Sequence, residues 1–405
     1  MSNNYGLDLT NISNKQMSKS DNFFQFNKWF FSTIAIFILM VVSFNALIDP
    51  YGIYKSPIFV GINHVKPQKK FNDRLVKAIE IIHTKPFTIF LGSSRTKQGL
   101  DPNHLALSNF KPVYNIGLDG SNPYELLRYL QHTIKNQPHL KQVILGVDFF
   151  MFNESLGNQP GFDENRLEKT YIIPNDIINS LFSLDVLQIN RETILASLQN
   201  NHPAETSEEN GYVPNYKYEK KPITFRFRHF INSYFVLHYQ YKFSDKYFDY
   251  FRQIINLCQE RNIKLIVFIS PSHATQWEAI RVTGQWPTFE SWKEKIVQLS
   301  PVWDFSGYNS ITTEAINDMM VNYVDNSHYT TRVGNLLINR IFGYKENELP
   351  ADFGILVNKD NIEYHLAKIR ADREEWLKKH KDEFDLVQSL EKQFLAAQQD
   401  KNSKQ

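Results

Sequence analysis

The stretch Thr88-Ile89-Phe90-Leu91-Gly92-Ser93-Ser94-Arg95-Thr96 decides the fold of this chain. Its apolar run is too short for a helix and is rich in bulky side chains, so it predicts a buried β-strand. Gly92 permits a sharp turn at the carboxyl end of that strand, where open α/β sheets place their ligands. We therefore expect the hydroxyl of Ser94 to be directed towards a crevice at this edge of the sheet.

A second stretch, Tyr323-Val324-Asp325-Asn326-Ser327-His328-Tyr329, lies far away in the sequence. Asp325 and His328 are close enough in sequence for both side chains to lie on one turn. The carboxylate can then orient the imidazole, which can accept a proton from a serine that the fold brings near. Either stretch alone is a weak signal, because a lone histidine usually caps or packs. Read together, they indicate a Ser-His-Asp triad.

The composition limits the possible classes of function. The chain has 405 residues, of which 42% are hydrophobic and 14% aromatic, which is ample for a sizeable core. A formal net charge of +2 without a basic patch argues against nucleic acid as a partner. The single cysteine, Cys258, excludes an internal disulfide and is compatible with cytosol or periplasm. We expect neither a metal nor a cofactor, because zinc-ligand spacings, a P-loop and a Gly-x-Gly-x-x-Gly turn are all missing from the sequence.

Residues Trp29 to Ile48 (WFFSTIAIFILMVVSFNALI) predict a transmembrane helix. An uncharged run of this length rises ~1.5 Å per residue and can span the ~30 Å hydrocarbon layer. A buried core helix is the first alternative, but the few polar residues of the run do not form a long face. A cleaved signal peptide is the second, but its apolar region is usually shorter, and Phe44-Asn45-Ala46 is a poor cleavage site. Lysines before the run place its amino end in the cytoplasm.

Short apolar strands alternate with helical periodicity along the rest of the chain, which is typical of a parallel sheet with helices on both faces. The expected strands are 88–92, 113–117, 142–148, 263–269 and 302–305, and the expected helices are 71–84, 124–134, 247–261, 289–299, 311–323 and 331–342. The aromatic segment 225–251 is interpreted as core helices, with a sugar-stacking or acyl-binding surface as the alternative. The resulting segments are a disordered cytoplasmic N-terminus (1–28), the anchor (29–48), a linker with a leading helix (49–85), the α/β domain (86–345) with a lid or partner surface inserted at about 153–245, and a charged tail (346–405) with one helix after residue 360.

The order of these motifs resembles the SGNH (GDSL-like) hydrolase superfamily over about residues 86–343. Leu91-Gly92-Ser93-Ser94 resembles its first block, with Ser94 at the nucleophile position. Asn115-Ile116-Gly117-Leu118-Asp119-Gly120 resembles the second, and Asp325-Asn326-Ser327-His328 the last. The resemblance implies a flavodoxin-like three-layer sandwich, preceded here by one N-terminal transmembrane helix.

Two positions depart from the family pattern. Ser93 replaces the usual aspartate, and the third block reads Gly146-Val147-Asp148-Phe149, without the asparagine that donates to the oxyanion. The oxyanion would then depend on the amides of Ser94 and Gly117, helped by Arg95. Losing one donor costs ~2.7–4 kcal/mol of transition-state stabilisation. The expected site comprises the catalytic residues Ser94, Asp325 and His328 and the oxyanion or substrate residues Asn115, Gly117, Arg95, Asp148 and His273, the last interpreted as structural or substrate-facing.

The third block, the Gly-Ser-Ser start and the anchor are similar to those of the alginate O-acetylation proteins and the D-alanyl transfer protein of teichoic acid synthesis. That resemblance implies a single-pass protein of the cytoplasmic membrane with its catalytic domain on the extracytoplasmic (periplasmic) side. It also implies O-acyl transfer, with acetyl as the expected group, from a multi-spanning membrane acyltransferase to an envelope polysaccharide. An esterase using the same triad, and a non-catalytic glycan-binding or assembly protein, stay open as alternatives.

Overall fold

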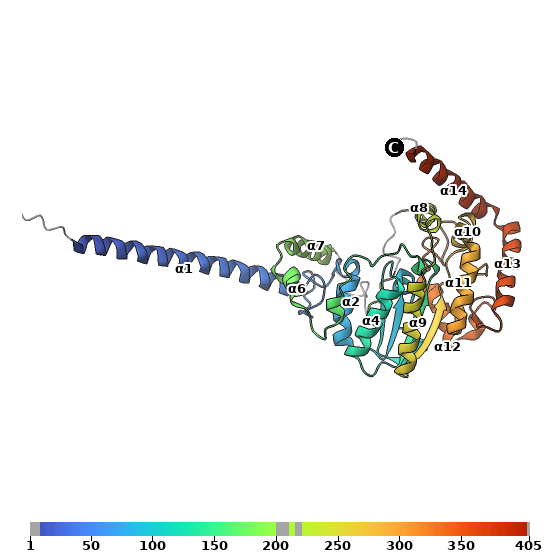
Figure 1. The fold of residues 1–405 in the computed structure, drawn as a ribbon, viewed down its shortest axis with the longest axis horizontal. Coiled ribbons are helices and arrows are strands. Elements are labelled where there is room, and N and C mark those ends of the chain that lie inside the picture. The colour runs from blue at the N-terminus through green and yellow to red at the C-terminus, as the bar shows by residue number, and fades with distance from the viewer. Residues whose placement is uncertain (1–8, 200–209, 215–220, 403–405) are drawn as a thin grey trace, which may run out of the picture. The chain divides into compact units, whose positions relative to one another are not determined.

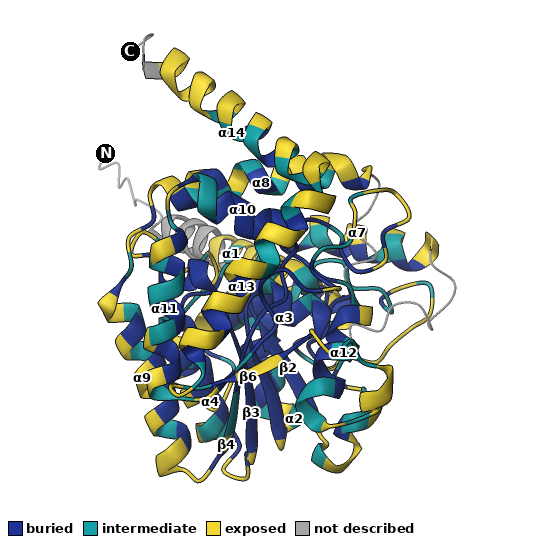
Figure 2. Cartoon of the chain, turned by 90° about the vertical axis from the view of Figure 1, so that its right-hand side faces the viewer, coloured by how far each residue is buried: buried dark blue, intermediate teal, exposed yellow. Residues whose placement is uncertain are grey.

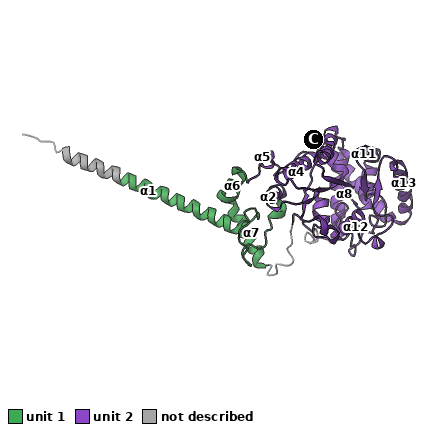
Figure 3. Ribbon diagram, turned by 90° about the horizontal axis from the view of Figure 1, so that it is seen from below, with its two compact units in different colours: residues 1–71, 172–203 green, residues 72–171, 204–405 purple. Residues whose placement is uncertain are grey.

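The computed structural model describes residues 9–199, 210–214 and 221–402. They belong to two compact units: residues 1–71 with 172–203, and residues 72–171 with 204–405 (Figure 3). The first unit contains the N-terminal apolar helix, and the second contains the sheet and every residue of the expected site.

The second unit is an α/β fold with a mostly parallel sheet of six strands in the order β2-β1-β3-β4-β5-β6. Figure 1 shows the strands of this unit as arrows among its helices. The first five strands of this order run parallel, and β6 is antiparallel to β5. The strands are β1 (Thr88–Gly92), β2 (Val113–Gly117), β3 (Gln142–Val147), β4 (Lys264–Ile269), β5 (Val302–Asp304) and β6 (Ile355–Val357).

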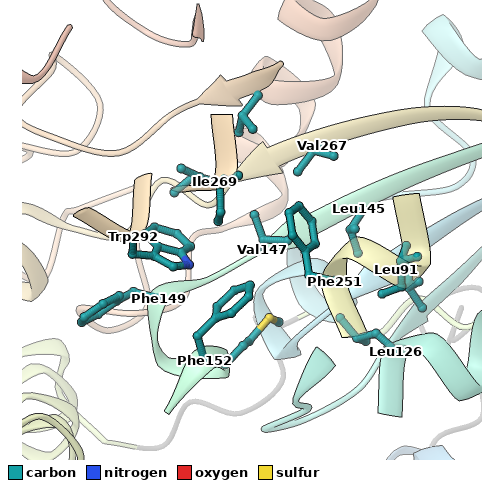
Figure 4. Close-up of a cluster of buried hydrophobic side chains, with 14 of the residues drawn as sticks. Leu91, Leu126, Leu145, Val147, Phe149, Phe152, Phe251, Val267, Ile269 and Trp292 are labelled. Carbon is teal, nitrogen blue, oxygen red and sulfur yellow. The ribbon is translucent and has the colours of Figure 1, made fainter. Parts of the chain in front are cut away.

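Helices cover both faces of this sheet. The side chains of each strand point alternately to the two faces, and each face forms its own hydrophobic cluster with the helices that cover it. Ile89 and Leu91 of β1 pack with side chains from α2, α4, α9 and α11, whereas Phe90 packs with residues of α8 and α12. Figure 4 shows Leu91 in the first of these clusters. Burying one such side chain stabilises the fold by roughly 1.5–3 kcal/mol. The helices of this unit are α2 (Asp73–Thr84), α3 (Ser94–Gly99), α4 (Pro123–Asn136), α5 (Glu164–Leu167), α8 (Ile223–Tyr239), α9 (Asp245–Glu260), α10 (Ala274–Val282), α11 (Trp286–Leu299), α12 (Thr331–Phe342), α13 (Ile362–Lys379) and α14 (Lys381–Asn402), with short 3₁₀ turns η2 (Leu105–Phe110), η3 (Phe149–Phe152) and η7 (Glu346–Glu348).

Glycines at the ends of three neighbouring strands let helix α3 approach the sheet closely. Gly92 and Gly117 lie opposite each other in the register of β1 and β2, and Gly146 lies near the end of β3. A Cβ on Gly92 or Gly146 would collide with Thr96, and one on Gly117 would collide with the backbone of Lys97. The three glycines therefore fix where α3, and with it Ser94, lies.

The first unit is built around α1 (Leu9–Ile48), which contains the apolar stretch Asn22–Ile48. This helix is long and apolar enough to be a signal anchor or a signal sequence. The unit also contains η1 (Lys69–Phe71), α6 (Pro174–Ile177), the π-helical turn η4 (Ile178–Phe182) and α7 (Asp185–Gln199).

Several expectations for individual segments are wrong. Residues 9–28 continue α1 and are not disordered, whereas residues 1–8 lie outside the described part. Residues 311–323 form turns, because Asn309 accepts from the N–H groups of Ile311 and Thr312, and the Thr312 hydroxyl donates to the Gly307 carbonyl.

The tail and the insertion also differ from expectation. Within residues 346–405, β6 joins the sheet, and two helices, α13 and α14, follow it where one was expected. Exposed residues line the outer sides of both helices (Figure 2). Of the insertion at 153–245, residues 172–203 belong to the first unit, and α8 is a helix that packs into the second.

Candidate active site

Ser94, His328 and Asp325 form a hydrogen-bonded chain at the carboxyl edge of the sheet. The Ser94 Oγ lies 2.8 Å from His328 Nε2, and His328 Nδ1 lies 2.9 Å from Asp325 Oδ2. A carboxylate can only accept, so Nδ1 carries the proton and Nε2 can accept from the serine hydroxyl. Ser94 is half-buried and His328 is buried. This arrangement can make the serine nucleophilic.

Local sequence explains where the nucleophile lies. Ser94 is the first residue of α3, and Ser93 is the N-cap, whose hydroxyl accepts from the N–H of Arg95 at 3.2 Å. A serine is among the preferred residues at this position, because its side chain satisfies an N–H that the helix leaves unpaired. A single residue, Ser93, therefore separates the strand from the helix, and Ser94 lies at the junction.

The turn that carries the histidine is held by its own aspartate. Asp325 Oδ1 accepts from the N–H groups of both Ser327 and His328 at 2.8 Å. The flanking residues Tyr323 and Tyr329 pair through an isolated antiparallel bridge. The short spacing of Asp and His thus serves two purposes: it closes the turn and it aligns the carboxylate with the imidazole.

Arg95 and Asp148 have a different role from the expected one. Both are buried, and Arg95 Nη1 lies 2.8 Å from Asp148 Oδ1, while Ser93 Oγ donates to Asp148 Oδ2 at 2.7 Å. Burial disfavours the charge of Arg95, but Asp148 outweighs this and raises the pKa of the guanidinium. The pair therefore braces the turn around the nucleophile, and Arg95 is not directed at an oxyanion.

Gly117 and Asn115 also differ from the expectation. The N–H of Gly117 donates to Asn115 Oδ1 at 2.8 Å, so it is already occupied. The Asn115 amide donates to the carbonyls of Thr96 and Leu100, which ties β2 to α3. Of the two expected amide donors, only the N–H of Ser94 has no acceptor among the described residues.

His273 is structural. It is fully buried and caps α10, where its Nδ1 accepts from the N–H of Thr275 at 3.2 Å. Its Nε2 lies 2.7 Å from the carbonyl of Glu314, to which it donates. Burial lowers the pKa of His273 to about 4. The ring is therefore neutral and has both nitrogens occupied.

Helix α8 contributes residues that sequence reasoning missed. The hydroxyl of Tyr234 lies 3.1 Å from Arg95 Nη2 and 2.8 Å from Ser327 Oγ, so it joins the two turns of the site. The ring of Phe230 packs edge-on against His328, with centroids 5.3 Å apart. Both residues lie in the segment expected to be an insertion, and its aromatic density was the only signal.

A charge cluster forms around the buried ammonium of Lys97, in which the Asp119 carboxylate is half exposed. Lys97, one turn after Ser94, lies 2.6 Å from Asp73 Oδ2 and 2.8 Å from Asp119 Oδ2. Burial disfavours the charge of Lys97, but the two carboxylates raise its pKa. Asp119 follows β2 in the second sequence block, so this cluster fixes that block against α3.

Among the described residues, no group of three or more His, Cys, Asp or Glu side chains is placed to hold a metal ion. No protein-family model matches the chain, and no curated protein matches it. The geometry of the site and the sequence motifs are therefore what indicates the function.

Proposed function

We propose that the protein is a membrane-anchored serine O-acyltransferase of the SGNH type. The observation that carries the proposal is the hydrogen-bonded chain from Ser94 Oγ through His328 to Asp325. The strand order supports it, because 2-1-3-4-5 is the flavodoxin-like doubly wound order, in which ligands bind at the carboxyl ends of the strands. Ser94 lies at that edge.

The proposed reaction has two halves. The Ser94 Oγ attacks the carbonyl carbon of the acyl donor, and His328 Nε2 takes the hydroxyl proton and returns it to the leaving group. An acyl-Ser94 ester forms. An acceptor hydroxyl then attacks this ester while His328 takes its proton, and the proton returns to Ser94 as the O-acylated acceptor leaves. Asp325 keeps the imidazole in the required tautomer and stabilises its charged form.

The oxyanion site favours an activated donor. The N–H of Ser94 is the remaining expected donor, because Asn115 occupies the N–H of Gly117 and Asp148 holds Arg95. One missing donor raises the barrier by ~2.7–4 kcal/mol. Slow attack on unactivated esters follows, which fits transfer from a reactive donor better than general ester hydrolysis.

Hydrogen bonds at the end of α1 favour an anchor that is kept over a signal sequence that is cleaved. The last four carbonyls of a helix lack intrahelical partners. Here all four are bound by groups of the same unit, so removing the helix would cost each of those groups a hydrogen bond. The partners of the carbonyls of residues 45–48 are, in order, the N–H of Asp49, the hydroxyl of Ser56, the amide of Asn63 and the ammonium of Lys66.

The remaining parts of the proposal depend on sequence resemblance alone. They are the acetyl group, the envelope polysaccharide as acceptor, the multi-spanning acyltransferase as donor and the extracytoplasmic location of the catalytic unit. The esterase alternative uses the same triad. The non-catalytic alternative draws support from the occupied N–H of Gly117.

The test is acylation of the full-length protein in detergent with p-nitrophenyl acetate. Mass spectrometry should find an acetyl group on the Ser94 peptide, absent from Ser94→Ala and His328→Ala. Ser108→Ala, which removes an exposed hydroxyl, is the matched control. Discharge of the adduct by a glycan faster than by water identifies a transferase, and discharge by water alone an esterase. A folded protein without any adduct refutes autonomous acyl chemistry.

A further inference from the structure

The first unit has a polar interior. Helix α7 buries Asn190, Thr193 and Ser197, all fully inaccessible to solvent. Asn190 Nδ2 donates to the buried Oδ1 of Asn45 in α1 at 2.7 Å, and Ser197 Oγ accepts from the N–H of Val65 at 3.0 Å. Apart from Val186, the buried side of α7 is thus lined by hydrogen-bonding groups.

The outer surface of the same unit exposes large apolar side chains beside charged and polar ones. The side chains of Phe182 and Leu184, at the start of α7, are 51% and 58% exposed, and Leu198 near its end is 57% exposed. In the loop after α1, Ile58 is 69% and Val60 65% exposed. A segment that buries asparagine, threonine and serine while exposing phenylalanine and leucine reverses the pattern expected in water.

Hydrogen bonds hold both apolar segments at the last turn of α1. Asn45 Nδ2 donates to the carbonyls of Leu181 at 2.8 Å and Ser183 at 3.3 Å, the residues on either side of Phe182. Asn63 Nδ2 donates to the Leu47 carbonyl at 2.9 Å, and its Oδ1 accepts from the N–H of Phe59 at 2.7 Å.

These bonds define the depth of the apolar segments along α1. At ~1.5 Å per residue, Asn45 lies roughly 4.5 Å inside the end of the helix at Ile48. Phe44 and Leu47, on the same turn, are also exposed. The apolar surface of α1 therefore continues onto the neighbouring segments at the level where a transmembrane helix reaches the interface.

We propose that residues 57–62 and 182–184 insert into the boundary between headgroups and acyl chains of the bilayer that α1 crosses. Together they form a collar around the end of the anchor. The occupant of the apolar surface is lipid, because the surface is continuous with that of the span and side chains bind several backbone groups of both segments, which lowers the cost of moving them out of water. This inference rests on α1 spanning the membrane, which is part of the proposed function.

Depth measurements with single-cysteine variants of the full-length protein test the collar. In a Cys258→Ser background, Val60→Cys and Phe182→Cys carry a bimane label. Phe37→Cys in α1 is the reference for the span, and Tyr364→Cys on the charged helix α13 is the matched control for an exposed aromatic in water. The labelled proteins are placed in phosphatidylcholine vesicles with or without brominated acyl chains.

Labels at 60 and 182 should be quenched by brominated lipid several-fold more than the label at 364, and should resist aqueous iodide. If they behave like 364 while 37 is quenched, the collar is refuted and the anchor stands. If 37 is also unquenched, the anchor fails and the collar with it. Labels at 60 and 182 that neither quencher reaches would show that protein covers this surface, which also refutes the proposal.

Discussion

Two adjacent turns of the second unit have related sequences and opposite roles. Ser270-Pro271-Ser272-His273 follows β4, and Asp325-Asn326-Ser327-His328 precedes α12. They touch, because the N–H of His273 donates to the carbonyl of Asn326 at 3.1 Å. One histidine bonds to Ser94, and the other is sealed inside the fold.

The two histidines differ in the hydrogen-bond partners of their ring nitrogens. In His328 a carboxylate holds Nδ1, which leaves Nε2 for the nucleophile. In His273 a helix N–H bonds Nδ1 and a backbone carbonyl bonds Nε2, so no nitrogen remains for chemistry. A histidine near a strand end is therefore informative only when a carboxylate nearby in sequence can reach it.

The largest expected effect is that of His328→Ala. Without the base, acylation of Ser94 should fall by roughly 10⁶-fold, as for other serine nucleophiles that lose their histidine. The rate of p-nitrophenol release measures this. His139→Ala, at an exposed histidine, should retain full activity. A His328→Ala protein with an unchanged rate would place the base elsewhere.

Asp325→Asn should lower the rate by about 10⁴-fold, because an amide facing Nδ1 favours the wrong imidazole tautomer. Single-turnover acetylation followed by mass spectrometry is the measurement. Asp318→Asn makes the same change at an exposed position and should have no effect. Equal rates for the two variants would contradict the proposed role of Asp325.

His273 should make folding stability depend on pH. Burial holds its pKa at about 4, against 6.5 for the ordinary group, so the folded state keeps the ring neutral. Between pH 6.5 and 4 the unfolded chain binds a proton that the folded chain does not. Stability should therefore fall as the pH drops through this range, by on the order of 3 kcal/mol.

Urea unfolding of wild type and His273→Asn across that range tests this effect. Asparagine keeps a side-chain acceptor at the helix cap but does not titrate. The variant should be less stable near neutral pH and should lose less stability on acidification. Parallel curves for the two proteins would assign the acid sensitivity to other groups.

The smallest expected effect is that of Tyr234→Phe, which removes the hydroxyl shared by Arg95 and Ser327. The free energy of unfolding should fall by about 1 kcal/mol, the typical net value of a hydrogen bond. Activity should persist, because Asp325 still closes the His328 turn. Tyr171→Phe, at an exposed position, is the control for urea unfolding. A loss of activity as large as that of Asp325→Asn would show that α8 positions His328.

The sequence predicted elements well where local chemistry determines them. Strand β2 and helix α12 have the expected bounds, 113–117 and 331–342, because glycine ends each of these segments or follows it. The helix predicted over residues 311–323 is absent, because threonine and asparagine side chains there bind nearby backbone groups and compete with helix formation. Strand β6 was not predicted, because its three residues lie in the stretch that was interpreted as a charged tail.

In the candidate site, too, the sequence predicted the local contacts but not those between distant segments. The Asp-x-x-His spacing correctly placed Asp325 beside His328, because the contact is local. The occupied N–H of Gly117 could have been foreseen, since asparagine often bonds the N–H two residues onward, as Asn115 does. Tyr234 could not, because it reaches Arg95 only through the packing of α8, far along the chain.

The paired asparagines of the first unit also fix the rotational phase of α1. Asn45 is bound on one side to Asn190 and on the other to the turn at Leu181. The helix is uninterrupted from Leu9 to Ile48, so the hydrogen bonds at its carboxyl end determine the direction in which every residue points around the helix axis. Phenylalanines recur at seven-residue intervals along one exposed side, at positions 23, 30, 37 and 44. The folded unit therefore determines which way this aromatic row points around the axis of α1.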